Sequence, residues 1–356
     1  SYPKILFLNL LNLTSLKKIS QNLGYHQRMS EIYAGNKGLA NLGNTCYMNS
    51  ALQCLSHLLT FHPHNEKFHA EVEVSSGDCL MKDWYEFQKA MWSNEAGIVN
   101  PMRLLQGFQR LCAAHNLYFE NFDQNDVDEF LTLFLDLIHR GIKRPVSFKM
   151  KHEVSDPYIK KAHQVWDSFY RKDYSYIVHN FHSQTFGLTT CPKCEYVTSN
   201  HDPIQVLTIE FPNNAKTLED CLRKHCETHK LDDDNLWKCD KCHQNVQSVK
   251  RNILWKTSDV LMILLKRYSG SRKLTRHLRF PEILEIKPYT MNYDYSSPST
   301  TYALQGVAVH SGSLGGGHYY ALCKNHLDNS WRQYNDTNVS RVSRETLLQE
   351  RPYLFF

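Results

Sequence analysis

The sequence lacks three features that would define a class at once: a long hydrophobic run, a block of like charge and an internal repeat. Its longest purely apolar run spans residues 260–265, far below the ~18 residues that a membrane-spanning helix needs, so we expect a soluble protein without a membrane partner. Its 41 Lys and Arg residues exceed its 36 Asp and Glu residues to give a net charge of +5, without a basic tail or stripe. This pattern argues against nucleic acid as a partner.

Cysteine is also too sparse for a small disulfide-stabilised scaffold, because 11 residues among 356 fall below the ~8–10% typical of that class. The odd count leaves at least one free thiol, so the protein either occupies a reducing compartment or is secreted with an unpaired cysteine. The first interpretation needs fewer assumptions and predicts an intracellular protein of the cytoplasm, the nucleus or both. With 42% hydrophobic and 12% aromatic residues, the chain can form a core of about two domains or one elaborate domain.

Hydrophobic periodicity divides the chain into a helical first half and a second half made mostly of strands. Apolar residues recur at helical spacing over residues 47–59 and 130–138. Short runs rich in aromatic and β-branched residues predict strands at 186–189, 206–211, 260–265, 302–310 and 319–323. Residues 291–301 predict a mobile loop. Residues 4–13 begin like a signal peptide, but Asn9 and Asn12 interrupt the apolar stretch, so we expect a helix packed on the domain.

Two CxxC turns, Cys191 with Cys194 and Cys239 with Cys242, lie in the strand-rich half. Two such turns can complete a tetrahedron of sulfurs around Zn²⁺, and four sulfur ligands leave no open position, so the predicted zinc is structural. The alternatives are a redox CxxC, which needs one motif in a thioredoxin-like context, and a pair of turns that has lost its metal. Nearby ligand-type residues form no such pair and are predicted to be ordinary helix residues: Cys221, His225, Cys226 and His229.

Cys46 stands just before the first predicted helix, where the helix N-terminus favours a thiolate. A cysteine at the start of a helix is more often a buried core residue than a nucleophile, so a nucleophile needs a partner base. His318 follows three glycines and begins a predicted strand, which would hold its imidazole rigidly. Farther on, Asn335 and Asp336 offer an amide and a carboxylate, and either could orient the imidazole if the two strands pair.

Together with Gln-Asn-Asp-Val-Asp-Glu-Phe at residues 124–130, these segments resemble the ubiquitin-specific protease family of papain-like cysteine deubiquitinases over about residues 37–356. The resemblance implies an α+β fold shaped like a right hand. Its helical thumb would lie mostly in residues 37–140, its zinc-ribbon fingers in about 181–260, and its palm mostly in 261–356. Residues 1–36 would form an N-terminal extension. The implied partners are ubiquitin and ubiquitinated proteins, the implied cofactor is one structural zinc ion, and we expect a monomer.

The resemblance also assigns roles by position. Cys46 matches the nucleophile, and His318 matches the general base and acid. Asn335 matches the residue that orients the imidazole, a role that Asp336 could share. Asn41 matches the side chain that stabilises the oxyanion. The implied substrate-binding residues are Gln124, Asp126, Glu129, Gly317 and Tyr319. The remaining cysteines are expected to be core or surface thiols: Cys54, Cys79, Cys112, Cys221, Cys226 and Cys323.

One departure from the family pattern lies in the acidic segment. The common Gln-Gln-Asp-Ala-Gln-Glu-Phe becomes Gln-Asn-Asp-Val-Asp-Glu-Phe, which adds the acid Asp128 beside Asp126. The departure concerns recognition of the basic ubiquitin tail and leaves the chemistry untouched.

The implied reaction is hydrolysis of the isopeptide or peptide bond after the C-terminal glycine of ubiquitin, through a thioester. Three alternatives remain open: a ubiquitin-binding scaffold whose triad aligns only with a partner or substrate, a protease for a ubiquitin-like modifier with the same Gly-Gly tail, and a zinc-ribbon nucleic-acid binder. The acidic residues 232–234, close to the lysines of the CxxC region, argue against the last.

Overall fold

The structure is a computed structural model. It describes residues 33–75, 77, 79–119, 125–148, 155–232, 234–269, 272–291, 300–313 and 316–356. The predicted N-terminal helix, the extension up to residue 32, Gln124 and nearly all of the predicted mobile loop lie outside the described residues.

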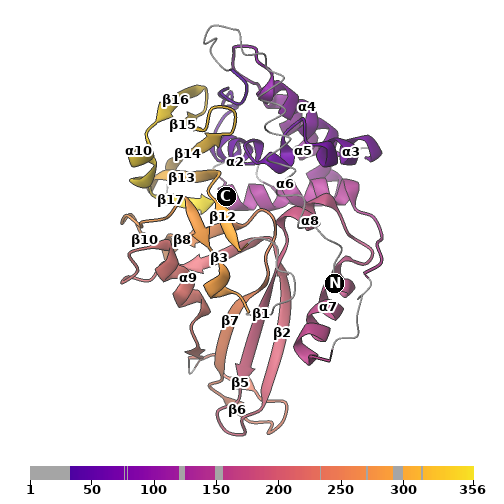
Figure 1. The fold of residues 1–356 in the computed structure, drawn as a ribbon, viewed down its shortest axis with the longest axis vertical. Coiled ribbons are helices and arrows are strands. Elements are labelled where there is room, and N and C mark those ends of the chain that lie inside the picture. Colours follow the sequence, from indigo (N-terminus) through magenta and orange to yellow (C-terminus); the bar gives the residue numbers. More distant parts are fainter. Residues whose placement is uncertain are drawn as a thin grey trace.

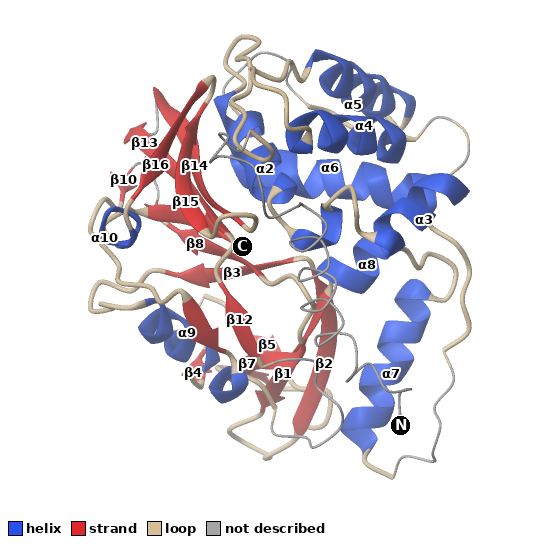
Figure 2. Cartoon of the chain, turned by 45° about the horizontal axis from the view of Figure 1, so that its top comes forward, coloured by secondary structure: helices blue, strands red, loops and turns tan. Residues whose placement is uncertain are grey.

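Helices fill the first half of the chain and strands most of the second, as the sequence predicts (Figures 1 and 2). The two predicted helices are present, and residues 59–61 form a separate 3₁₀ turn, η1, after the first of them. The helices of this half are α2 (Cys46–Ser56), α3 (Glu66–Val74), α4 (Leu80–Trp92), α5 (Met102–Ala114), α6 (Val127–Ile142), α7 (Pro157–Tyr170) and α8 (Tyr176–Phe181). No helix in the described ranges combines the length and apolar character needed to cross a membrane.

A seven-stranded sheet forms the centre of the molecule, in the order β16-β15-β14-β13-β17-β8-β3. All its neighbouring strands are antiparallel except β3 and β8, which run parallel. The last strand in chain order, β17, lies between β13 and β8. The bounds are β3 (Val206–Glu210), β8 (Met262–Lys266), β13 (Gly306–Ser313), β14 (Gly316–Asn325), β15 (Ser330–Asn335), β16 (Asn338–Val342) and β17 (Pro352–Phe355), with helix α10 (Arg344–Leu348) before β17.

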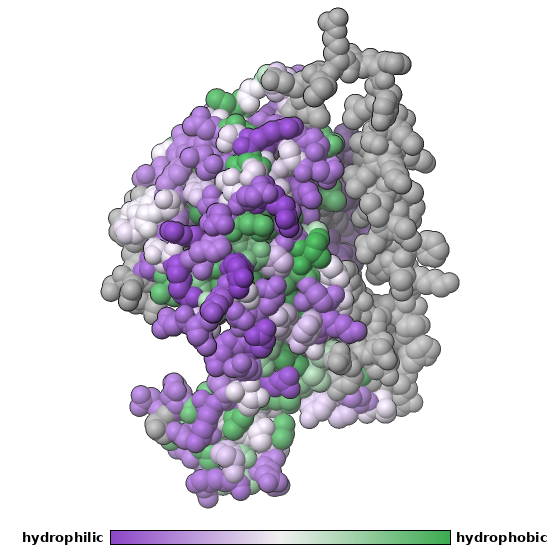
Figure 3. All heavy atoms as spheres, turned by 60° about the vertical axis from the view of Figure 1, so that its left-hand side comes forward, coloured by the Kyte–Doolittle hydropathy of each residue, from purple (hydrophilic) through white to green (hydrophobic). Residues whose placement is uncertain are grey.

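A second, four-stranded sheet in the order β2-β1-β7-β4 extends away from the large one and ends in a two-stranded ribbon (Figure 1). Its strands are β1 (Ser183–Thr190), β2 (Val197–Ile204), β4 (His229–Lys230) and β7 (Val249–Lys256), and the ribbon is β5 (Trp237–Lys238) with β6 (Asn245–Val246). Seen from one side, the end of this sheet projects below the body of the molecule and leaves a hollow between them, on a face where hydrophilic residues predominate (Figure 3).

Short elements complete the part of the molecule around the large sheet. Strand β3, within the segment predicted as fingers, belongs to the large sheet, and α9 packs against β3 and β7. The elements are α9 (Leu218–Cys226), the two-stranded pairs β9 (Tyr268–Ser269) with β10 (Arg272–Lys273) and β11 (Ile283–Glu285) with β12 (Thr301–Ala303), and the 3₁₀ turn η2 (Lys287–Tyr289).

The large sheet separates two hydrophobic cores. Alternate residues of a strand point to opposite faces, so in β14 Ala321 and Cys323 join the core shared with the helices, whereas Leu322 joins the core shared with α9. Helix α2 is buried along its whole length and packs on β14. The sequence after Cys46 is therefore held against the strand that begins near His318.

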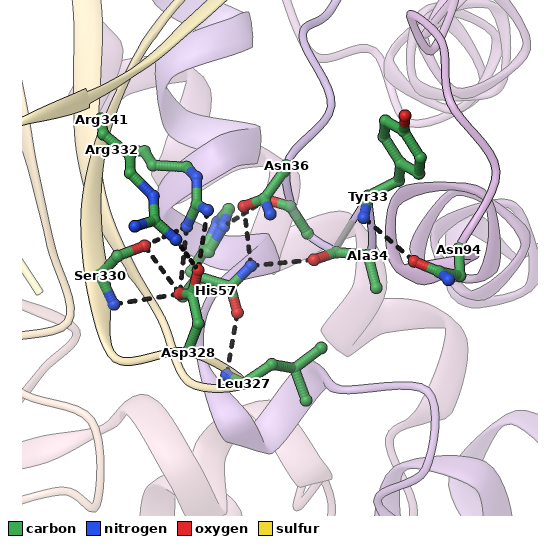
Figure 4. Close-up of polar contacts among 12 residues, drawn as sticks. Tyr33, Ala34, Asn36, His57, Asn94, Leu327, Asp328, Ser330, Arg332 and Arg341 are labelled. Carbon is green, nitrogen blue, oxygen red and sulfur yellow. Dashed lines mark hydrogen bonds and ion pairs between the residues drawn. The ribbon is translucent and has the colours of Figure 1, made fainter. Parts of the chain in front are cut away.

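The segment that leads into α2 is fixed by hydrogen bonds from two sides (Figure 4). The backbone N–H of Tyr33 donates to Asn94 Oδ1 at 3.0 Å, and Asn325 Nδ2 donates to the Ala34 carbonyl at 2.8 Å. Close by, Asp328 accepts from the guanidinium groups of Arg332 and Arg341, each at 2.8 Å. The Asn325 bonds to Ala34 and to Asn36 tie this segment to the β14–β15 hairpin, and the Asp328 contacts join the turn of the hairpin to its strands β15 and β16.

Candidate active site

Cys46 is the first residue of α2 and is 8% exposed. The chain reaches it through a tight turn in which Gly43 and Asn44 adopt positive φ angles of 100° and 52°. Asn41 Oδ1 accepts hydrogen bonds from the Gly43 N–H at 3.0 Å and the Thr45 N–H at 3.3 Å, which closes the turn. The thiol is thus presented at the N-terminal end of a buried helix.

Burial raises the pKa of the Cys46 thiol, a backbone hydrogen bond from Tyr319 opposes this shift, and the negative charge of Asp336 adds to it. Because the net effect is a raised pKa, the thiol needs an adjacent base to become a nucleophile at neutral pH. Tyr319 directly follows His318 in β14, so the strand that carries the predicted base reaches the nucleophile.

The imidazole of His318 is oriented by Asn335, with 2.6 Å between His318 Nε2 and Asn335 Oδ1. This contact exists because β14 and β15 pair antiparallel, with Ala321 opposite Tyr334, as the sequence analysis required. An amide oxygen only accepts hydrogen bonds, so Nε2 carries the hydrogen and Nδ1 keeps its lone pair. The imidazole is therefore held in the tautomer that can accept a proton at Nδ1.

Asp336 lies next to Asn335, but its carboxylate bonds to other groups. Its Oδ2 accepts from Asn41 Nδ2 at 2.9 Å, and its Oδ1 accepts from Asn49 Nδ2 at 2.8 Å. Asp336 itself has a positive φ of 49° at the β15–β16 turn. The structure thus bonds Asn335 to the imidazole of His318 and Asp336 to Asn41, and Cys46 is linked to this group through the backbone of Tyr319.

The predicted tail-binding residues lie around the start of α6 and β14. Asp126 is the N-cap residue of α6, yet its side chain accepts from the hydroxyls of Tyr319 at 3.1 Å and Tyr353 at 2.8 Å instead of capping the helix. Glu129 is exposed. At Gly317, an added Cβ would lie 2.2 Å from His310 Nε2, so only glycine fits.

His310 lies on β13, directly opposite Tyr319 of β14. Its ring lies 4.4 Å from the Tyr319 ring, centroid to centroid, and its Nδ1 lies 2.5 Å from the Tyr268 hydroxyl and 2.9 Å from Lys273 Nζ. Burial lowers the pKa of His310 to about 4, so this imidazole is neutral at physiological pH.

Sequence reasoning missed Asn49 and Tyr353. Asn49 lies three residues after Cys46, and residues at this helical spacing share a face, so the periodicity of α2 contained a signal for it. Tyr353 had no local signal, because it reaches Asp126 only through the pairing of β17 with strands distant in the sequence.

The four predicted metal ligands also meet. Cys191 and Cys194 lie in the turn between β1 and β2, and Cys239 and Cys242 in the turn between β5 and β6. The four Sγ atoms lie within 4.8 Å of one another, with 3.8 Å between Cys191 and Cys242 and 3.6 Å between Cys194 and Cys239. This arrangement can hold a metal ion, and no second such group of three or more ligand residues occurs in the described part of the chain.

The other cysteines are free thiols, of which Cys226 is half-buried and the rest are buried. They match the prediction of core or surface thiols. The members of this set are Cys54, Cys79, Cys112, Cys221, Cys226 and Cys323.

Comparison with known proteins identifies the family. The model of the ubiquitin carboxyl-terminal hydrolase family matches residues 37–356. The chain is 31% identical over 360 residues to ubiquitin carboxyl-terminal hydrolase Usp2 of Drosophila melanogaster, covering 97% of this chain and 37% of that protein. It is 29% identical over 353 residues to ubiquitin carboxyl-terminal hydrolase 2 of Bos taurus, covering 95% and 57%. The chain thus spans about two fifths to three fifths of the length of these relatives.

Solved structures with a similar fold include the yeast SAGA DUBm with an Sgf73 mutant, with a TM-score of 0.71 and 24% identity over 98% of this chain and 74% of that chain. The SAGA Ubp8/Sgf11/Sus1/Sgf73 DUB module bound to ubiquitin aldehyde gives a TM-score of 0.67 and 24% identity, covering 99% and 75%. These similarities confirm the predicted α+β right-hand fold. With the family match over residues 37–356, they lead to one conclusion: the chain belongs to the ubiquitin carboxyl-terminal hydrolase family, among the ubiquitin-specific proteases.

Proposed function

We propose that this chain hydrolyses the isopeptide or peptide bond after the C-terminal glycine of ubiquitin, with Cys46 as the nucleophile. The observation that carries the proposal is the 2.6 Å contact between His318 Nε2 and Asn335 Oδ1. The residue after His318 in β14, Tyr319, hydrogen-bonds through its backbone to the Cys46 thiol. The similar Ubp8 module is bound to ubiquitin aldehyde in one structure and to monoubiquitin in another, which supports ubiquitin as the substrate.

The reaction follows from the positions of the proton donors and acceptors. His318 Nδ1 takes the proton of Cys46, and the thiolate attacks the carbonyl carbon of the terminal glycine. The imidazolium then protonates the departing amine, which leaves a thioester on Cys46. His318 next takes a proton from water as the water oxygen attacks the thioester carbonyl. The C–S bond then breaks, the imidazolium returns its proton to the Cys46 sulfur, and the C-terminal carboxylic acid is released and ionises in solvent.

Asn41 is assigned to the oxyanion that forms in both attacks, together with the backbone N–H of Cys46. The Nδ2 group of an asparagine carries two hydrogens, and the bond to Asp336 at 2.9 Å uses one of them. The second remains for the oxyanion, in a direction that the Asp336 bond fixes. We therefore assign Asn335 to the orientation of His318 and Asp336 to the orientation of Asn41.

The tail of ubiquitin is basic and ends in two glycines, and the groups around α6 and β14 suit both properties. The carboxylate of Asp126, held by Tyr319 and Tyr353, and the exposed Glu129 offer negative charge. Gly317 presents bare backbone beside His318. These residues are proposed to hold the tail, with Gln124 assigned to the same role by sequence alone.

The metal in the cysteine cluster is proposed to be Zn²⁺. Zinc–sulfur bonds of ~2.3 Å in a tetrahedron place the sulfurs about 3.8 Å apart, which agrees with the separations of 3.6 and 3.8 Å. Each CxxC turn is also closed by the same backbone bonds, from the Glu195 N–H to the Cys191 carbonyl and from the His243 N–H to the Cys239 carbonyl. The ion would hold the two turns together and take no part in hydrolysis.

The remaining predictions are kept as proposals on chemical grounds. Five thiols must stay reduced for the nucleophile and the metal site to work, so we propose an intracellular, reducing setting in the cytoplasm or nucleus. We further propose a monomer whose partners are ubiquitin and ubiquitinated proteins, without a nucleic-acid or membrane partner.

The proposed function can be tested with ubiquitin that carries a C-terminal electrophile. Wild type should form a covalent adduct, detected by intact-mass spectrometry, and Cys46→Ala should form none while still binding ubiquitin. Cys226→Ala, which removes a half-buried thiol, is the matched control and should react like wild type. Binding without adduct in wild type would instead select the scaffold alternative.

A further inference from the structure

Asn49 occupies a position that the proposed mechanism has not used. It lies on α2 three residues after Cys46 and is 2% exposed. Its Nδ2 donates to Asp336 Oδ1 at 2.8 Å and to the Ala40 carbonyl at 3.3 Å. The other carboxylate oxygen of Asp336 accepts from Asn41 at 2.9 Å. Two amides therefore hold one carboxylate from opposite oxygens.

The Asp336 turn is fitted closely against the chain that leads to Asn41. The Leu39 N–H donates to the Asp336 carbonyl at 2.8 Å. At Gly38, an added Cβ would lie 2.3 Å from the Thr337 carbonyl oxygen. These contacts fix the backbone of Asp336, but they leave the rotation of its carboxylate to the two amide bonds.

The burial of Asn49 has a cost that points to a role for its amide hydrogens. Its Oδ1 is buried without a hydrogen-bond partner among the described residues, and an unpaired buried polar atom destabilises a fold. Rotating the amide by half a turn would place this oxygen against the Asp336 carboxylate, where two acceptors repel. The orientation that donates to Asp336 is thus the favourable one, although it leaves Oδ1 unpaired.

We propose that Asn49 is a positioning residue, which fixes the carboxylate of Asp336 so that Asn41 aims its second N–H at the oxyanion. The proposal rests on the proposed function, because it acts through the assigned role of Asn41. Without Asn49, the carboxylate is free to rotate, and the Asn41 amide rotates with it. The thiol of Cys46 and the tail-binding carboxylate of Asp126 keep their own contacts, so the loss should fall on kcat and spare KM.

The test is a double-mutant cycle on the full chain, with a ubiquitin substrate that releases a fluorophore. Asn41→Ala should lower kcat by ~10²–10³, the effect of losing one oxyanion donor in another protease. Asn49→Ala should lower kcat by at least about tenfold, with KM changed less than about twofold. Because Asn49 acts through Asn41, the double variant should be no slower than Asn41→Ala alone.

Gln53→Ala is the matched control. Gln53 lies on the same helix, is also 2% exposed and also has an unpaired buried amide oxygen, but its Nε2 donates to the Lys37 carbonyl and not to the active site. It should lower the thermal midpoint as Asn49→Ala does, with kcat unchanged. The proposal is wrong if Asn49→Ala, like Gln53→Ala, lowers the thermal midpoint and leaves kcat unchanged. It is also wrong if the effects of Asn49→Ala and Asn41→Ala on kcat multiply in the double variant.

Asn49→Asp keeps the shape of the side chain and tests the positioning role of Asn49 if Asn49→Ala does not fold. Two facing carboxylates repel unless they share a proton, so the ratio of its kcat to that of wild type should rise as the pH falls. A ratio that is independent of pH would overturn the proposal. Normal turnover by Asn41→Ala would instead refute the oxyanion assignment, which separates the two failures.

Discussion

The pH dependence of stability should reveal the pair of carboxyl groups at the start of α6. Burial raises the pKa of Asp128 from 3.8 to about 7, with further contributions from the charge of Asp126 and a hydrogen bond to it. The folded state therefore binds a proton that the unfolded state has already released between about pH 4 and pH 7. The stability that this proton contributes is fully present below pH 4 and is lost as the pH rises through 7.

The size of the effect follows from the shift. A change from 3.8 to about 7 is roughly three units, and each unit corresponds to about 1.4 kcal/mol, so the upper limit is about 4 kcal/mol. Asp128 is only partly buried, and solvent screens its repulsion from Asp126. We therefore expect a loss on the order of 1–2 kcal/mol in the free energy of unfolding across this range.

Urea unfolding of wild type and Asp128→Asn at about pH 4 and about pH 8 measures this loss. The stability of wild type should fall more than that of the variant between the two conditions, by on the order of 1–2 kcal/mol. Asp173→Asn is the matched control: a hydrogen bond from Lys143 lowers the pKa of Asp173, so its contribution to stability is lost only below about pH 4 and this variant should parallel wild type between the two conditions. Parallel pH profiles for wild type and Asp128→Asn would show that Asp128 does not retain the proton.

Three further outcomes are expected. Tyr353→Phe removes a 2.8 Å hydrogen bond to Asp126, and hydrogen bonds to charged groups contribute ~1.5–3 kcal/mol. Steady-state kinetics should therefore show KM for ubiquitin substrates raised about tenfold or more, with kcat unchanged. Cys239→Ser should abolish stoichiometric zinc in elemental analysis and lower the thermal midpoint, whereas full stability without metal would contradict a structural site. Burial lowers the pKa of His62 to about 3 and of His326 to about 4, from 6.5. The stability that these neutral imidazoles contribute is therefore present above pH 6.5 and is lost as the pH falls toward 4. His326→Phe should make the thermal midpoint less dependent on pH in this acidic range, and an unchanged dependence would contradict the prediction.

Local patterns in the sequence predicted the parts of the fold that local interactions determine. The apolar spacing after Cys46 predicted α2, and the matched CxxC turns predicted a cluster whose four sulfurs do meet. Helix α7, whose bounds the sequence analysis did not predict, buries Ile159, Ala162 and Trp166 at helical spacing. This signal was present and was overlooked.

The remaining features depend on contacts between residues far apart in the chain. The parallel pairing of β3 with β8 joins segments separated by α9 and strands β4 to β7, and no spacing rule indicates it. By residue type alone, the sequence offered Asn335 and Asp336 as partners for His318, and only the family resemblance favoured Asn335. Only the β15–β16 turn, with its positive φ at Asp336, decides which side chain meets the imidazole and which meets Asn41.

The place of β17 bears on how the protein is made. Residues 352–355 supply the strand between β13 and β8, and Tyr353 supplies one of the two hydroxyls on Asp126. Ribosomes deliver a chain from its N-terminus at a limited rate, so a nascent chain contains Cys46 and His318 before the central sheet can close. Until β17 emerges, strands β13 to β16 are not joined to β8 and β3, and Asp126 lacks the hydroxyl of Tyr353, so translation itself delays completion of the proposed tail-binding site.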